Sequence, residues 1–201
     1  MAGLGTLMNV AGILAGGLAG LIFGKFMTQR YQDTLTMACG VSVMFIGIAG
    51  TMEKMMSVAG QSLTSGGTMM MIGSFMIGSL LGEWMNIEHY LEELGRWLKA
   101  KTGSSGDKLF VDGFVTASLT VCIGAMAVVG AIQDGIYGNY SILAAKAVLD
   151  LIIILVMTAS MGKGCLFCAI PVGVFQGFIT FLARLIEPFM TEAALNNLSL
   201  T

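Results

Sequence analysis

Long uncharged stretches recur along the chain, each close to the length that crosses a bilayer as a helix. A membrane-spanning α-helix needs about 20 predominantly apolar residues. Six stretches approach this length, namely residues 4–24, 34–52, 67–82, 109–132, 141–161 and 164–183. They predict an all-α fold, a polytopic transmembrane helical bundle with about six membrane helices.

The most polar segment, residues 83–108, carries a different pattern. Apolar side chains recur there at spacings of three and four residues, as on one face of a helix. They are Trp84, Ile87, Leu91, Leu94 and Leu98. Charged side chains, among them Glu92 and Arg96, fall on the other face. The pattern predicts an amphipathic helix at the cytoplasmic membrane interface, or alternatively a soluble helix that packs on a partner subunit.

The order of these segments indicates a single membrane domain, residues 1–201, with two three-helix halves. The first half is residues 1–82, the amphipathic helix and a flexible connector are residues 83–108, and the second half is residues 109–201. Because three crossings invert the second half, this layout is typical of an inverted-topology repeat. Only short apolar strings match between the halves, so the repeat stays a hypothesis.

Composition argues for a membrane protein and against a soluble enzyme. The 201 residues are 56% hydrophobic and 11% charged, with a mean hydropathy of +0.84, whereas soluble domains are about 25% charged. The single histidine, His89, provides neither a metal cluster nor a pair of nucleophile and base. We therefore expect no catalytic residue, no metal and no cofactor.

Charge also bears on partners and on orientation. With a net charge of −2 and scattered basic residues, the chain lacks the basic stripe that tracks phosphates, so the expected partner is the lipid bilayer and not nucleic acid. Lys and Arg gather in cytoplasmic loops. If the N-terminus lies outside, seven basic residues fall on the cytoplasmic side and two, Lys54 and Arg184, fall outside. The count predicts an outside N-terminus, with the first stretch retained as a helix because no positive region precedes it.

Glycine is unusually frequent within the apolar stretches. The chain has 28 glycines in 201 residues, about twice the usual ~7%. Small residues let membrane helices approach closely, and two strips have near-regular spacing. The first consists of Gly16, Gly20 and Gly24, and the second of Gly73, Gly78 and Gly82. We expect both strips to pack helices, either within one chain or across a homodimer.

A few polar side chains interrupt the apolar stretches and are the candidates for a solute or ion pathway. Lys146 and Asp150 are four residues apart and can pair on one helix face. Ionisable groups inside a bilayer are expensive, so the pair is either structural or part of a substrate or proton path. Asn9 and Gln176 have two interpretations as well, a hydrogen bond between helices or a polar pathway.

Two further features belong to the same hypothesis. Gln133 and Asp134 lie where the fourth stretch ends, as pathway residues or as ordinary helix-terminus residues. Pro171 precedes Gln176 and predicts a kink or break in the sixth stretch, of the kind that exposes backbone groups to ions or substrates. Cys122 looks like a small apolar filler.

Two regions of the sequence resemble a known family. The first is the opening Gly5-Thr6-Leu7-Met8-Asn9 with the glycines that follow it, and the second runs from Asp112 to Leu119 and from Gly124 to Gly135, continuing through Lys146, Asp150 and Gln176. Together they are similar to the bacterial YdfK/YqgA-like membrane proteins, the domain of unknown function 554. The resemblance implies a bacterial inner-membrane location and no settled activity. Members of that family usually continue with a further hydrophobic helix.

The sequence thus favours a transporter of an unidentified small solute or ion, acting through a polar interior near the membrane midplane. A channel or an oligomeric membrane scaffold without transport coupling is the alternative, because glycine strips alone suffice for it. Neither function requires catalysis.

Overall fold

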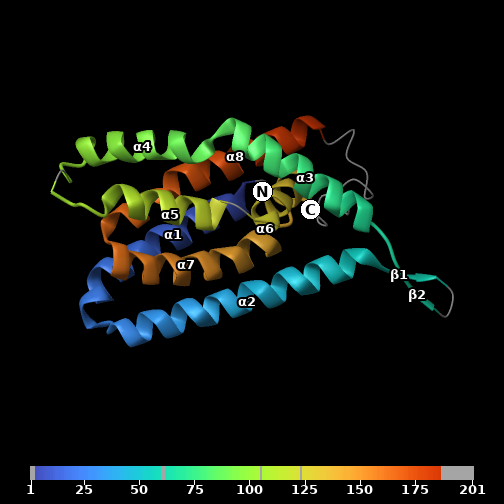
Figure 1. The fold of residues 1–201 in the computed structure, drawn as a ribbon, viewed down its shortest axis with the longest axis horizontal. Helices are drawn as coiled ribbons and strands as arrows, with labels where there is room; N and C mark the ends of the chain where they lie inside the picture. The colour runs from blue at the N-terminus through green and yellow to red at the C-terminus, as the bar shows by residue number, and fades with distance from the viewer. Residues whose placement is uncertain (1–2, 60–61, 105, 123, 187–201) are drawn as a thin grey trace.

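The computed structural model describes residues 3–59, 62–104, 106–122 and 124–186, and these are almost entirely helical (Figure 1). In chain order the elements are α1 Leu4–Phe23, η1 Gly24–Phe26, α2 Gln29–Met55, β1 Met56–Ala59, β2 Ser62–Ser65, α3 Thr68–Met85, α4 Ile87–Lys101, α5 Phe110–Cys122, α6 Ala125–Tyr137, α7 Ser141–Met161, η2 Lys163–Cys168 and α8 Ala169–Ile186. The predicted all-α bundle is confirmed, apart from one short antiparallel pair, β1–β2.

Four stretches among the described residues are long and apolar enough to cross a membrane. They are Leu4–Phe23, Gln29–Met52, Ser141–Met161 and Lys163–Leu185. A fifth crossing results if α5 and α6, which are bent by 59° at a short break, count as one span. The remaining expected crossing, the third stretch at residues 67–82, corresponds to α3, which is not among these spans. The predicted number of six is therefore not confirmed.

Helices α1 and α7 form the centre of the bundle and approach each other through glycines. A Cβ atom added to Gly20 would lie 2.5 Å from the backbone oxygen of Leu155, and one added to Gly12 would lie 2.8 Å from that of Ala147. Gly16 likewise faces the backbone of Leu151. Because the contacts recur every four residues on both helices, the first glycine strip is a backbone-to-backbone contact within one chain.

The second glycine strip has a different environment. No atom lies within 4 Å of a Cβ added to Gly73, Gly78 or Gly82. None of the residues of α3 is buried, and the segment formed by α2, the two strands and α3 extends beyond the bundle at one end (Figure 1). The predicted packing of Gly78 and Gly82 is therefore not made within the described part of this chain.

Helix α4 packs along α5 through the apolar stripe found in the sequence. Leu98 is buried, and Leu91 and Leu94 pack with it against Phe110 and Phe114. The first stripe residues, Trp84 and Ile87, remain exposed. The amphipathic helix thus covers part of its own bundle with the last three residues of the stripe.

Pro171 does not break α8. Pro171 lies in the first turn of α8, where a helix loses nothing from a missing N–H, so α8 runs unbroken past Gln176. The sharp bend lies instead between α5 and α6, near Gly124. The 3-10 helix η2 ends at Cys168 and α8 begins at Ala169, so the sixth stretch is irregular just before Pro171 and not at the proline itself.

The proposed duplication gains no support from the fold. Helix α1 is continuous, whereas the span that would correspond to it in the second half is broken between α5 and α6. Helix α1 also packs mainly on α7, in the opposite half. The inverted repeat stays an unsupported hypothesis.

Candidate functional site

A pair of amide side chains joins the first and last described helices. The Asn9 Nδ2 atom donates to Gln176 Oε1 at 3.2 Å, across 167 residues of sequence. Both side chains have no exposed surface. A fully buried polar contact therefore joins α1 and α8.

The ion pair on α7 lies beside this amide pair. Lys146 Nζ is 2.8 Å from Asp150 Oδ2 and 2.9 Å from Oδ1, and both residues are buried. Asn9 is also close enough to the Asp150 carboxylate to interact with it. Asn9, Lys146, Asp150 and Gln176 thus form one group from three helices, which we call the polar cluster.

Glycine packing explains how the polar cluster is assembled. Gly12, one turn after Asn9, fits against the backbone of Ala147, the residue next to Lys146. This close approach sets the register of α1 on α7, because neither helix can slide without placing a side chain against backbone. Asn9 is thereby held at the level of the ion pair.

Each amide of the polar cluster keeps one hydrogen-bonding atom without a partner among the described residues, Asn9 Oδ1 and Gln176 Nε2. Asp150 Oδ2 also lacks a hydrogen bond, although it lies 2.8 Å from Lys146 Nζ. Amide oxygen and nitrogen positions can be exchanged without changing the shape of either side chain. After exchanging both, one acceptor and one donor again remain free. A buried group left unpaired costs about 1–3 kcal/mol. A polar occupant that formed hydrogen bonds with these two atoms would remove this cost.

Polar contacts continue from the cluster along α1 toward its N-terminal end. The hydroxyl groups of Thr6 and Thr180 are 3.3 Å apart, one turn from Asn9 and Gln176 respectively. Asp134 of α6 follows, with no exposed surface. Its Oδ2 atom accepts the backbone N–H groups of Gly3 at 3.1 Å and Gly5 at 2.9 Å.

Asp134 therefore acts at the end of a different helix from its own. A carboxylate at a helix N-terminus satisfies unpaired N–H groups and complements the helix dipole, and Asp134 does this for α1. Gln133, its neighbour, is only half-buried and lies outside the polar cluster. The backbone oxygen of Gln133 accepts from Asn139, and no hydrogen bond of its side chain is found among the described residues.

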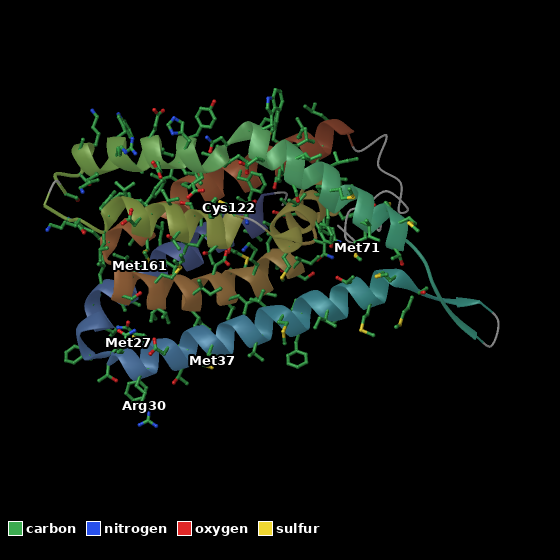
Figure 2. All side chains as sticks on the ribbon, viewed as in Figure 1. Met27, Arg30, Met37, Met71, Cys122 and Met161 are labelled. Atoms are coloured by element: carbon green, nitrogen blue, oxygen red, sulfur yellow. The ribbon has the colours of Figure 1, made fainter. Side chains whose placement is uncertain are left out.

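The broken helix ends near the polar cluster, at Cys122. This residue ends α5, lies within electrostatic range of Lys146 and Asp150, and is seen in the middle of the bundle in Figure 2. Helix ends carry partial charges and free backbone groups. Sequence reasoning missed this position and took Cys122 for a filler, although Gly124, two residues later, was a signal for a break.

The other reactive residue types do not assemble a site. Cys165 and Cys168 are buried in the apolar core with Ile13, Val121 and Ile154. His89 is exposed on α4, 3.6 Å from Glu93. Within the part of the chain that the structure describes, no group of three or more His, Cys, Asp and Glu residues could hold a metal ion.

Comparison with known proteins identifies relatives that match nearly the whole chain. The chain is 27% identical over 197 residues to the uncharacterized membrane protein YdfK of Bacillus subtilis (strain 168), covering 98% of this chain and 80% of that protein. It is 24% identical over 203 residues to the uncharacterized protein YqgA of Escherichia coli (strain K12), with the same coverage. No solved structure matches the chain. The sequence profile of one family matches residues 4–201, and the chain therefore belongs to the family described as protein of unknown function (DUF554).

Proposed function

We propose that this membrane protein transports a small polar solute through the polar cluster. The observation that carries the proposal is that Asn9, Gln176 and the Lys146–Asp150 pair are buried together between apolar helices. Charged and polar side chains are costly at membrane depth, and those that occur there mark solute or ion pathways. Their position between helices of the bundle matches the usual place of transporter sites.

The unpartnered atoms favour a pathway over a purely structural ion pair. A structural pair needs only its own two charges and the hydrogen bonds that satisfy them. Here Asn9 interacts with the pair and bonds Gln176 in turn, and each of the two amides keeps a free bonding position. Buried polar groups are normally satisfied, so an occupant that completes the pattern gives these residues a reason to be there.

The broken helix supports the same function. Transporters commonly place discontinuous helices at their binding sites, because unwound backbone offers groups that a continuous helix does not. The bend between α5 and α6 ends α5 at Cys122, near both charges of the pair. A bend at this point offers a movable element on one side of the polar cluster.

The distribution of basic residues supports a cytoplasmic membrane with the N-terminus outside. The C-terminal ends of α1, α4 and α7 lie at one end of the bundle (Figure 1). Most of the basic residues lie close to these helix ends in the sequence, among them Lys25, Arg30, Lys101, Lys108 and Lys163. Arg30 points away from the helices at this end (Figure 2). Since Lys and Arg are retained on the cytoplasmic side, we assign this end to the cytoplasm.

The test replaces the charged pair by apolar residues of similar size. In liposomes containing the purified protein, the double variant Lys146→Met with Asp150→Leu should fold yet lose solute uptake. Replacing a buried ion pair by apolar residues is often neutral or stabilising, so folding is expected to survive. Each single variant should be less stable, since it leaves one charge unpaired. A folded double variant with full uptake would refute a pathway through the pair.

An oligomeric channel or scaffold is the second candidate, and one observation favours it. Helix α3 has no buried residue, and its glycines Gly73, Gly78 and Gly82 face open space, as expected of a helix that packs on another copy. Saturable uptake and exchange of labelled for unlabelled solute would support a transporter. Uptake that rises linearly with concentration would support a channel, and a complete lack of uptake would support a scaffold.

A further inference from the structure

We infer that the polar cluster binds a small zwitterion in which the ammonium and carboxylate groups are a few bonds apart, as in an α-amino acid. The inference rests on the proposed transport function and specifies its substrate class. It starts from two properties of the cluster, its balance of charge and its pair of unpartnered amide atoms.

The charge of the polar cluster is balanced. It contains one ammonium group, on Lys146, and one carboxylate, on Asp150, 2.8 Å apart. A lone cation or a lone anion entering the cluster would leave one uncompensated charge in a medium where this is costly. A zwitterion brings equal and opposite charges, so the total stays zero while each protein charge gains a second partner.

The free hydrogen-bonding atoms are likewise complementary, one acceptor and one donor. Asn9 Oδ1 is an acceptor and Gln176 Nε2 is a donor, and both lack partners among the described residues. A ligand ammonium group can donate to Asn9 Oδ1 and to Asp150. A ligand carboxylate can accept from Gln176 Nε2 and from Lys146. With both amides exchanged, Gln176 supplies the acceptor and Asn9 the donor, so the match does not depend on their assignment.

The compactness of the cluster limits the length of the ligand. Asn9 and Gln176 are joined by a hydrogen bond of 3.2 Å, and Lys146 and Asp150 are one helical turn apart. The free acceptor and the free donor belong to the same two amides that form this bond. An ω-amino acid with several methylene groups between its charges should therefore fit less well than glycine or alanine.

The first test measures binding to the purified wild-type protein in lipid nanodiscs by calorimetry. The probes are glycine and alanine, with four comparisons: glycine betaine, 5-aminopentanoate, acetate and methylammonium. We expect glycine or alanine to bind. Glycine betaine keeps both charges but has no ammonium N–H, so it should bind roughly tenfold or more weakly, as expected when a buried acceptor stays unpaired. Equal binding of glycine and glycine betaine would overturn the inference.

The second test uses matched variants. Gln176→Leu and Asn9→Leu each remove one amide of the cluster and should abolish glycine binding. Gln133→Leu makes the same chemical change at a half-buried position of α6 outside the cluster and should leave binding intact. Loss of binding in Gln133→Leu with retention in Gln176→Leu would overturn the inference. Because the probe comparison uses wild-type protein, it decides the matter even if a variant does not fold.

Uptake by liposomes separates this inference from the proposed function. Binding and saturable uptake of a zwitterion support both. Binding without uptake would overturn the transporter and leave the zwitterion site standing. Uptake of a simple cation or anion, with no zwitterion bound, would overturn the inference and leave the transporter standing. If none of the probes binds, the inference is wrong, and water alone satisfies the two amides.

Discussion

At the scale of single residues, polar side chains in this protein act on helices other than their own. Asp134 belongs to α6 and accepts the N–H groups of Gly3 and Gly5 at the start of α1. Asn9 belongs to α1 and bonds Gln176 of α8. Within membranes such bonds hold helices together because few other polar partners compete for them.

The role of Asp134 leads to a prediction about stability. Asp134→Leu leaves the N–H groups of Gly3 and Gly5 unpaired and removes a negative charge from a helix N-terminus, so it should destabilise the protein by about 1–3 kcal/mol. Asp134→Asn keeps an acceptor and should cost less. Thermal unfolding in detergent measures both, with Gln133→Leu as the control. Asp134→Leu as stable as wild type would contradict the capping role.

At the scale of elements, close packing of α1 on α7 organises the bundle. Gly12, Gly16 and Gly20 each lie against backbone atoms of α7, so there is no space for a side chain at these three positions. The glycines of α3 have a similar spacing along their helix, but a Cβ atom added to any of them would have no atom within 4 Å. Similar strips in the sequence therefore belong to different environments.

This difference predicts different outcomes for two equivalent substitutions. Gly20→Leu places atoms where the backbone of Leu155 lies, and overpacking of this kind costs at least about 1–3 kcal/mol. We expect loss of the folded protein, or a strong fall in its melting temperature, in size-exclusion chromatography and thermal unfolding. Gly78→Leu should leave the fold unchanged. If Gly20→Leu behaves as wild type, α1 and α7 do not approach as described.

The same pair of variants also informs the alternative function. A change in oligomeric state caused by Gly78→Leu, with the monomer still folded, would favour an interface on α3. An unchanged oligomeric state would count against such an interface.

At the scale of the whole molecule, the bundle has a basic end and an opposite end. Lys108 follows α4 and precedes α5 at the basic end, whereas Ser65 ends the strand pair that extends from the opposite end (Figure 1). Both residues are exposed. Although α3 is not among the candidate spans, α3 and α4 lie end to end along the bundle between the two positions (Figure 1). The two positions should therefore lie on opposite sides of the membrane.

Cysteine labelling tests this orientation. In a variant without native cysteines, Lys108→Cys should react with a membrane-impermeant thiol reagent only after the cells are opened. Ser65→Cys should react in intact cells. The reverse pattern would place the N-terminus inside and would contradict the assignment from Lys and Arg.

Local patterns in the chain specify the class of this protein and its candidate pathway residues. Apolar stretches of spanning length predict membrane helices, since bilayer thickness sets helix length. The cost of charge inside a membrane singled out Lys146 and Asp150, and their spacing of four residues predicted that they could pair. These inferences depend on local pattern and solvent, so they need no knowledge of which helices are neighbours.

Which helices meet, and with them which side chains, depends on the tertiary fold. The pairing of α1 with α7 brought Asn9 to Asp150, and the approach of α6 brought Asp134 to the start of α1. The bend between α5 and α6 brought Cys122 near the ion pair. Pro171, where a break was expected, lies in the first turn of α8. Contacts between residues more than a hundred positions apart depend on the packing of all the helices at once, which no local pattern in the chain specifies.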